Sequence, residues 1–332
     1  MRHPTVRRFL TCVSVHLCAT ALALLSLSCT HESEQPSHEQ VRTIAVLQLG
    51  SHQVIDSVVK GLEDQLEKIY GNRIRLVKYN ANFDMNTTGS MSRQMLASNA
   101  EILVGVTTPV SGQLVGVNGG TKPLVFTFVS DPGQIGYKGP GTLRNTTGLS
   151  DEVDYEKTLD MIRSIMPSAK RIGYPLTRSE NNAIVIHREF SRLAPSRGFE
   201  IITAEIAQAT DVRMAAETLA PRVDLFLFGG DNTVASGLGA LIAAAEGRSI
   251  PLFACDEESV QNGAVGAYSV DYAAMGRRTA EVCSMILGGA DPERIPLEVF
   301  VANRLILNKK AAQKARLSVP QELLTKAHRV VE

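Results

Sequence analysis

The chain has 332 residues, with 34 Lys and Arg against 34 Asp and Glu. Three of the basic residues and none of the acidic ones lie in the first 28, so a chain cleaved there would carry 31 basic against 34 acidic residues. This slightly negative balance argues against nucleic acid as a partner, and the roughly 290 remaining residues suggest two lobes of ordinary domain size.

The first 29 residues have the pattern of an export signal that ends at a cysteine. Arg2, Arg7 and Arg8 precede an uncharged stretch, residues 9–28, and Cys29 follows it. A basic start, an apolar middle and small residues before the cut are features of a signal peptide, so residues 1–28 are predicted to be removed. The stretch that ends at Cys29 (LLSLSC) resembles a lipobox with serine in place of the usual leucine, and Cys29 is therefore expected to carry lipid.

An uncleaved transmembrane anchor is the alternative interpretation of the same stretch, because about 20 apolar residues span a bilayer. Thr, Ser, His16 and two cysteines dilute it, however, and no basic stop-transfer cluster follows. We therefore expect a lipoprotein that is exported and anchored to a bacterial membrane, facing the periplasmic or extracellular side. Residues 29–42 are polar, as a flexible tether is, so the folded body is expected to begin at Thr43.

Apolar runs in the body, each followed by a polar loop and a helical pattern, predict parallel β/α units, and the order of these units occurs twice. Strands are predicted over 44–49, 102–106 and 122–126, and again over 171–174, 225–228 and 249–253, with helices over 55–70 and 183–197. The matched positions Ile44 and Ile172, Ile102 and Leu225, and Leu124 and Leu252 are 128, 123 and 128 residues apart. This near-constant offset indicates an internal duplication.

Two similar α/β lobes in tandem, each a doubly wound parallel sheet, follow from this duplication. Loops at the carboxyl ends of parallel strands form a crevice, so a ligand cleft is expected between the lobes, which would close by a hinge. The alternative is two independent domains that face away from each other. Matching hydroxyl, carboxylate and amide groups in the loops of both halves favour the shared cleft.

The C-terminal part predicts a helix over 272–287, whose apolar face carries Met275, Thr279, Val282, Cys283 and Ile286. A strand is predicted over 297–307 and a last helix over 321–331. Of the five cysteines, Cys255 and Cys283 are the two that lie beyond Cys29. Cys255 ends an apolar run and Cys283 lies in a helical pattern, so buried free thiols are favoured over a disulfide.

Several short motifs between Ile44 and Val331 occur together in the order of a known family. They are Gln48 after the first strand, Thr107-Thr108-Pro109, FTFVSDP at 126–132, NTTG at 145–148, Asn181-Asn182, Asp231-Asn232 with Ser236, Asp271-Tyr272 through Gly276, and Asn308 with Val319-Pro320. With this set the chain resembles the bacterial ABC transporter substrate-binding proteins whose characterised relatives take up aromatic amino acids. One departure is that His52-Gln53-Val54-Ile55-Asp56 stands where the family usually has His-Pro-x-Leu-Asp, which changes the shape expected of the first loop.

The resemblance implies the type I periplasmic-binding fold and a monomer that captures a small polar solute and delivers it to an ABC permease. The solute would be an amino acid, and an aromatic one in particular. Lobe 1 would comprise residues 43–147 plus about 271–300, and lobe 2 residues 148–270 plus about 301–332, with hinge segments near 145–151, 270–271 and 300–302. A ligand sensor of the same fold that acts on a signalling partner is the alternative function.

Polar residues that end the predicted strands are the expected ligand contacts. Thr107, Thr108 and Ser130 lie near helix starts, where unpaired backbone N–H groups favour the carboxylate of an amino acid. Asp231 is expected to accept hydrogen bonds from its ammonium group. The other expected contacts are Gln48, Ser51, Asp131, Asn181, Asn182 and Asn232, with Tyr174 first and Phe128 second to stack on an aromatic ligand. The alternatives are helix caps and turns for the polar residues and a place in the core for the rings.

Motifs of hydrolases, phosphate cradles and metal sites are absent from the sequence. Ser111 and Ser236 do not lie in a Gly-x-Ser-x-Gly elbow, and the glycine-rich stretch 133–141 lacks the Lys-Ser/Thr of a phosphate-binding loop. The histidine and cysteine spacings match no metal-binding pattern. We therefore expect no cofactor and no metal, and an enzyme is the least favoured of the alternatives.

Overall fold

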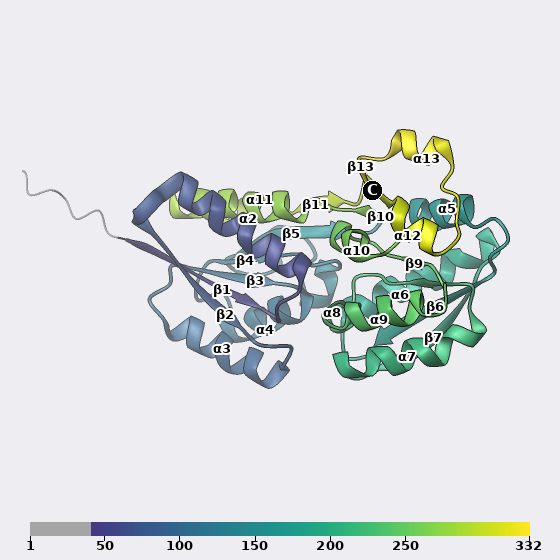
Figure 1. Ribbon diagram of the computed structural model, residues 1–332. Coiled ribbons are helices and arrows are strands. Elements are labelled where there is room, and N and C mark those ends of the chain that lie inside the picture. The colour runs from purple at the N-terminus through teal and green to yellow at the C-terminus, as the bar shows by residue number, and fades with distance from the viewer. Residues whose placement is uncertain (1–40) are drawn as a thin grey trace, which may run out of the picture. The chain divides into compact units, whose positions relative to one another are not determined.

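Apolar strands of the first half of the chain form a six-stranded parallel sheet. The computed structural model describes residues 41–332, and this sheet has the order β11-β5-β4-β3-β1-β2 (Figure 1). Its strands are β1 (Arg42–Gln48), β2 (Ile74–Asn80), β3 (Ile102–Val106), β4 (Leu124–Thr127), β5 (Thr146–Glu152) and β11 (Glu298–Val301). Strands β3 and β4 are buried along their whole length, which explains their uninterrupted apolar runs.

The second half repeats the arrangement with four parallel strands in the order β7-β6-β8-β9. They are β6 (Arg171–Thr177), β7 (Glu200–Ile206), β8 (Leu225–Leu227) and β9 (Leu252–Phe253). A bridge between Ala254 and Ala267 joins β9 to a three-stranded sheet of β10 (Gly266–Ser269), β12 (Arg304–Asn308) and β13 (Arg329–Val331). The orders β2-β1-β3-β4 and β7-β6-β8-β9 match, so the predicted α/β fold with two doubly wound parallel sheets is confirmed.

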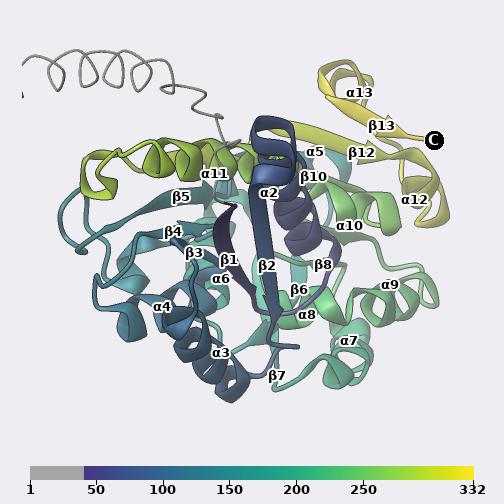
Figure 2. The same ribbon diagram turned by 90° about the vertical axis from the view of Figure 1, so that its left-hand side faces the viewer.

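Helices cover both faces of each parallel sheet. On the first sheet α2 (Gln53–Tyr70) and α11 (Tyr272–Leu287) lie side by side on one face, and α3 (Met85–Ala97) and α4 (Thr108–Asn118) cover the other (Figure 2). The second half contains α5 (Tyr155–Ile165), α6 (Asn181–Leu193), α7 (Val212–Leu219), α8 (Asn232–Ser236), α9 (Leu238–Glu246), α10 (Glu257–Asn262), α12 (Lys309–Lys314) and α13 (Gln321–Lys326). We call β1–β5, β11, α2–α4 and α11 lobe 1, and the remaining elements lobe 2.

Short 3-10 helices extend or connect these elements. They are η1 (Gly71–Arg73), η2 (Pro132–Ile135), η3 (Ala194–Arg197), η4 (Ala209–Asp211), η5 (Ala220–Arg222) and η6 (Pro292–Arg294).

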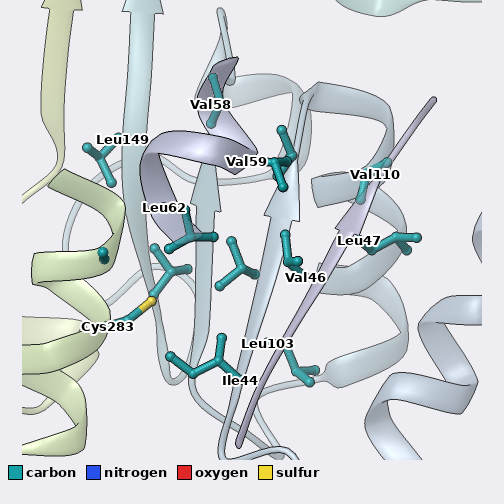
Figure 3. Packing of buried hydrophobic residues seen from close by; sticks show 14 of the residues in the cluster. Ile44, Val46, Leu47, Val58, Val59, Leu62, Leu103, Val110, Leu149 and Cys283 are labelled. Atoms are coloured by element: carbon teal, nitrogen blue, oxygen red, sulfur yellow. The ribbon is translucent and has the colours of Figure 1, made fainter. Parts of the chain in front are cut away.

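The core of lobe 1 lies between its sheet and the helices α2 and α11. Figure 3 shows Leu62 of α2, Cys283 of α11 and Ile44 of β1 in one buried cluster. The five residues predicted for the apolar face of the helix over 272–287 are all buried in α11. Cys255 and Cys283 are buried and free, which confirms the prediction of two free thiols.

Three predicted elements differ from the structure. The single strand predicted over 297–307 is two strands, because the chain leaves β11 in lobe 1 and enters β12 in lobe 2 after Ala302 and Asn303. The last helix predicted over 321–331 is α13 followed by β13, because residues 329–331 pair with β12. The helix predicted over 183–197 ends at Leu193, and η3, which contains Pro195, follows it.

The chain passes between the lobes three times. It does so after β5, between β10 and α11, and between β11 and β12. Strand β5 pairs with β4 at residues 146–148 and with β11 at residues 149–152, so its far end lies next to the first passage.

The predicted signal peptide, Cys29 and most of the predicted linker lie outside the described residues. Arg42, which was predicted to end the linker, instead begins β1 and forms an ion pair with Glu101 at 2.6 Å. Within residues 41–332, no helix has both the length and the apolar character needed to span a membrane.

Candidate functional site

Two adjoining cavities lie between the lobes, at the carboxyl ends of the parallel strands. One is an open groove of about 360 Å³ and the other a smaller inner cavity of about 20 Å³, and both are lined by His52, Val54, Phe228, Ala235 and Asp256. The first two residues lie at the start of α2 in lobe 1, and the other three follow strands of lobe 2. Ligands of doubly wound sheets commonly bind at this position.

Carboxylates dominate the polar lining of the cleft. Asp151 and Asp231 line the inner cavity, Glu258 lines the groove and Asp256 lines both, while no Lys or Arg among the described residues lines either cavity. Burial raises the pKa of Asp151 to about 6, and burial with the nearby Asp256 raises that of Glu258 to about 7. Burial also lowers the pKa of His52, so its ring is neutral near pH 7. A ligand with a positive charge would relieve the cost of burying these acids.

Asp231 is buried beneath α8 and is bound within its own lobe. Its Oδ1 accepts hydrogen bonds from the hydroxyl of Thr177 (2.9 Å) and from the backbone N–H of Val234 (3.0 Å). Its Oδ2 accepts a third from the backbone N–H of Thr177 (2.7 Å). Burial, together with the nearby Glu180, raises the pKa of Asp231. The residue therefore lies at the inner cavity and also caps α8.

Glu180, which the sequence analysis did not single out, holds the loop that follows β8. It is 5% exposed, and it accepts hydrogen bonds from the backbone N–H (3.1 Å) and side-chain amide (2.6 Å) of Asn232. It also accepts from the N–H and hydroxyl of Thr233 (2.8 and 2.6 Å) and from the amide of Asn182 (3.3 Å). The predicted amides of lobe 2 are thus held in place through Glu180, whose sole sequence signal is its position next to Asn181.

Asp151 and an aromatic pair form the lobe 1 side of the inner cavity. The rings of Phe128 and Tyr272 meet edge to face with centroids 4.9 Å apart, and both line the cavity. The hydroxyl of Ser130 donates to the two carboxylate oxygens of Asp151 at 3.2 and 3.1 Å. Phe128 was the second aromatic candidate, whereas Asp151 and Tyr272 were not predicted as contacts. Their available signals were the motif Asp271-Tyr272 and the end of the predicted hinge segment.

Tyr174 lies away from both cavities, which contradicts its predicted stacking role. Its side chain is fully buried in lobe 2, and its hydroxyl donates to the carbonyl of Gly229 (3.1 Å). The ring packs edge to face against His187, with centroids 5.0 Å apart. The reason is that β6, which carries Tyr174, is an inner strand of its sheet, with β7 and β8 on either side and helices packed against it.

Other predicted contacts are spread over the cleft loops. Ser51 lines the groove and Asn232 the inner cavity. Gln48 lies behind Ser51 and donates to its hydroxyl (3.2 Å). Asp131 caps η2 by accepting from the N–H of Gly133 (2.9 Å), and it lines neither cavity.

A further cavity of about 210 Å³ lies at the start of α4 and has lining residues from both lobes. Thr108 lines it from lobe 1 and Asn181 from lobe 2. The hydroxyls of Thr107 and Thr108 are buried and have no hydrogen-bond partner. Thr107 precedes α4 with φ 85° and does not cap it with its side chain. The first turn of α4 therefore retains donors for another group.

Three side-chain hydrogen bonds join the beginning of α2 to lobe 2. They connect His52 Nε2 with Asn232 Oδ1 (3.2 Å), the hydroxyl of Ser57 with Glu258 Oε1 (3.0 Å), and the amide of Asn262 with Gln53 Oε1. Because each bond crosses the cleft, the two lobes are in direct contact beside the cavities.

A family model describing ABC transporter substrate-binding proteins matches residues 43–331. The chain belongs to this family. A curated relative of this substrate-binding protein, a tyrosine-binding protein of Clostridioides difficile, is 27% identical over 299 residues, which cover 87% of this chain and 86% of the relative. The solved structure of an ABC domain in complex with L-Trp, from Streptococcus pneumoniae, is 26% identical with a TM-score of 0.83, covering 87% of this chain and 99% of that one.

An open relative differs more from this substrate-binding protein. The ligand-free, open structure of a substrate-binding protein with adhesive properties from Clostridium difficile is 25% identical and covers 88% of this chain and 99% of that one. Its TM-score is 0.64. At nearly equal identity and coverage, the arrangement described above is thus more similar to a ligand-bound relative than to an open one.

Proposed function

We propose that this substrate-binding protein captures an amino acid, in particular an aromatic one, between its lobes and delivers it to the permease of an ABC importer. The observation that carries the proposal is the inner cavity, which combines buried carboxylates with the rings of Phe128 and Tyr272. Carboxylates suit an ammonium group, and aromatic rings suit an aromatic side chain. The relatives named for tyrosine and L-Trp support the same ligand class.

The carboxylate of the ligand is proposed to bind at the start of α4. The unpartnered hydroxyls of Thr107 and Thr108 and the uncapped first turn of that helix support this assignment. Asn181 borders the same cavity from lobe 2, and Asn182 and Asn232 hold the neighbouring loop. In this arrangement Gln48 and Ser51 close the lobe 1 side.

Ligand capture is proposed to proceed by hinge closure through the three segments that join the lobes. A ligand drives closure only as far as it binds the closed state better than the open one. The three hydrogen bonds from the beginning of α2 to lobe 2 support the closed state, and the TM-scores against the ligand-bound and open relatives agree with it.

Replacing Ser57 with alanine is expected to lower ligand affinity about 5-fold, because a hydrogen bond of this kind contributes about 1 kcal/mol. The variant removes the donor to Glu258 across the cleft and leaves the remaining cleft residues unchanged. Isothermal titration calorimetry measures the affinity. Ser90→Ala is the matched control, since the exposed hydroxyl of Ser90 bonds within α3. Equal affinities of Ser57→Ala and wild type would show that this bond does not support closure.

The N-terminal sequence supports an extracytoplasmic location for this function. In the proposal, residues 1–28 are removed as a signal peptide, and Cys29 carries the lipid, with a palmitate chain, that anchors the protein to the membrane. A monomer on such a tether would present its closed form to the permease.

A thermal-shift screen of the purified protein against amino acids, nucleosides and sugars tests the proposed function. A ligand that binds the folded state alone raises the melting temperature, by an amount that grows with its concentration relative to Kd. We expect shifts with tryptophan, tyrosine or phenylalanine and none with sugars. A shift with a nucleoside or a sugar, and with no amino acid, would overturn the proposed ligand class.

A further inference from the structure

We propose that Asp151 binds the cationic nitrogen of the ligand, with Ser130 orienting its carboxylate and the rings of Phe128 and Tyr272 beside it. The inference rests on the proposed function, because it takes a ligand with an amino group to occupy the inner cavity. It moves the role of ammonium acceptor away from Asp231, which becomes a positioning residue for α8. No feature of the strand pattern distinguished these two acids in the sequence.

The acids of the cleft differ in how many acceptor positions the protein already uses. A carboxylate offers about four such positions. Asp231 receives three hydrogen bonds from its own lobe, and Asp256 receives two from Ser259, from its N–H (2.6 Å) and its hydroxyl (2.8 Å). Among the described residues, the side-chain donor to Asp151 is the single hydroxyl of Ser130. Asp151 therefore retains the most acceptor capacity in the inner cavity.

Glu258, the fourth acid, lies in a different part of the cleft. It lines the groove and not the inner cavity, and it accepts the hydroxyl of Ser57 across the lobes. A ligand nitrogen in the inner cavity, next to the aromatic pair, therefore meets Asp151 before it meets Glu258.

The surroundings of Asp151 favour a cation. The residue is 3% exposed, and no Lys or Arg among the described residues lines its cavity. Burial raises the pKa of Tyr272, and Asp151 contributes more to this rise than any other charged group, which places the phenol and the carboxylate close together. A buried carboxylate without a positive partner is costly, and a nitrogen between it and two ring faces or edges would gain from both.

The position of Asp151 also connects ligand binding with closure. It pairs with Phe300 near the end of β5, and α5 of lobe 2 begins four residues later, at Tyr155. Tyr272 begins α11 directly after the second passage between the lobes. A ligand bound to Asp151 thus contacts two of the segments through which the lobes are joined, whereas Asp231 lies within lobe 2.

Asp151→Asn tests the inference with little change in shape, and Glu152→Gln is the matched control. Glu152 is the next residue of the same strand, is exposed, and points to the opposite face. Affinities of wild type and both variants are measured for tyrosine, tryptophan and phenylalanine, for their deaminated analogues, and for amines such as tyramine that lack the carboxylate. We expect Asp151→Asn to lose about 100-fold in affinity for the amino acids and amines. It should lose nothing for the deaminated analogues, and Glu152→Gln should match wild type.

The melting temperature without ligand separates a binding effect from misfolding. Asp151→Asn removes a buried carboxylate, so at pH 8 its melting temperature is expected to equal or exceed that of wild type. Weaker binding by a variant of unchanged stability would then be due to the lost charge.

Two results would overturn the inference. One is an Asp151→Asn variant that binds amino acids as tightly as wild type does. The other is a loss of discrimination against the deaminated analogues in Asp231→Asn and not in Asp151→Asn. Failure of the proposed function has a different signature. Wild type would then bind amines but no amino acid, and if Asp151→Asn abolished that binding, the role of Asp151 would stand while the ligand class would change.

Discussion

Replacing Gly276 with alanine is expected to lower the free energy of unfolding by about 3 kcal/mol, because α2 and α11 meet there backbone to backbone. An added Cβ at Gly276 would lie 2.0 Å from the carbonyl oxygen of Val58 and 2.9 Å from the backbone nitrogen of Leu62. Gly61 has the reciprocal position on α2, where a Cβ would lie 2.3 Å from the carbonyl oxygen of Ala273. Backbone atoms of packed helices cannot move aside locally, so the helices would have to separate and expose core surface.

Urea unfolding followed by circular dichroism measures this loss. Gly116→Ala provides the matched control, since Gly116 lies in α4 and an added Cβ there would have no atom within 4 Å. That variant is expected to be stabilised by about 0.5 to 1 kcal/mol, because alanine is the better helix former. If both variants were equally stable, α2 and α11 would not pack as closely as described.

Ligand affinity is expected to fall about tenfold per pH unit below about pH 6, because the ammonium of an amino acid needs an ionised carboxylate. Burial raises the pKa of Asp151 to about 6, so this group becomes protonated in the free protein as the pH falls below that value. Above about pH 7 the affinity should be constant, since Glu258, whose pKa burial raises to about 7, is then ionised as well. Calorimetric titration between pH 5 and pH 8 measures the profile.

The stability of the ligand-free protein should change with pH in the opposite direction. A carboxyl group with a raised pKa binds more protons in the folded than in the unfolded state between about pH 4 and its folded pKa, so its contribution to stability falls as the pH rises through that window. Asp151, Asp231, Asp256 and Glu258 all have raised pKa values, whereas His52, whose pKa is lowered, acts with the opposite sign. The difference between wild type and Asp151→Asn isolates one group.

Wild type should therefore lose stability relative to Asp151→Asn as the pH rises from 5 to 7, while its ligand-induced shift in melting temperature grows. Thermal melts of both proteins, with and without ligand, measure the two trends. A wild-type affinity that stayed constant down to pH 5 would mean that no carboxylate of raised pKa binds the ligand.

Parts of the fold could be predicted because neighbouring residues encode them. The buried strands β3 and β4 are uninterrupted apolar runs, and α11 has the spacing of a half-buried helix, so both were identified with nearly correct bounds. Residues 297–307 and 321–331 were misassigned because strand pairing decides them. β11 pairs with β5 and β13 with β12, and neither partner is near in sequence.

The sequence by itself determined that two doubly wound parallel lobes occur in tandem, because burial periodicity and the repeated spacing of the strands are local properties of the chain. It also located the loops that border the cleft. Which polar groups there remain available to a ligand was decided by the tertiary structure alone. Asp231 is occupied by Thr177 and Tyr174 by Gly229, at separations of 54 and 55 residues. Asp151, by contrast, is left at the inner cavity with its acceptor positions largely free, because the pairing of buried polar groups depends on residues that folding brings together.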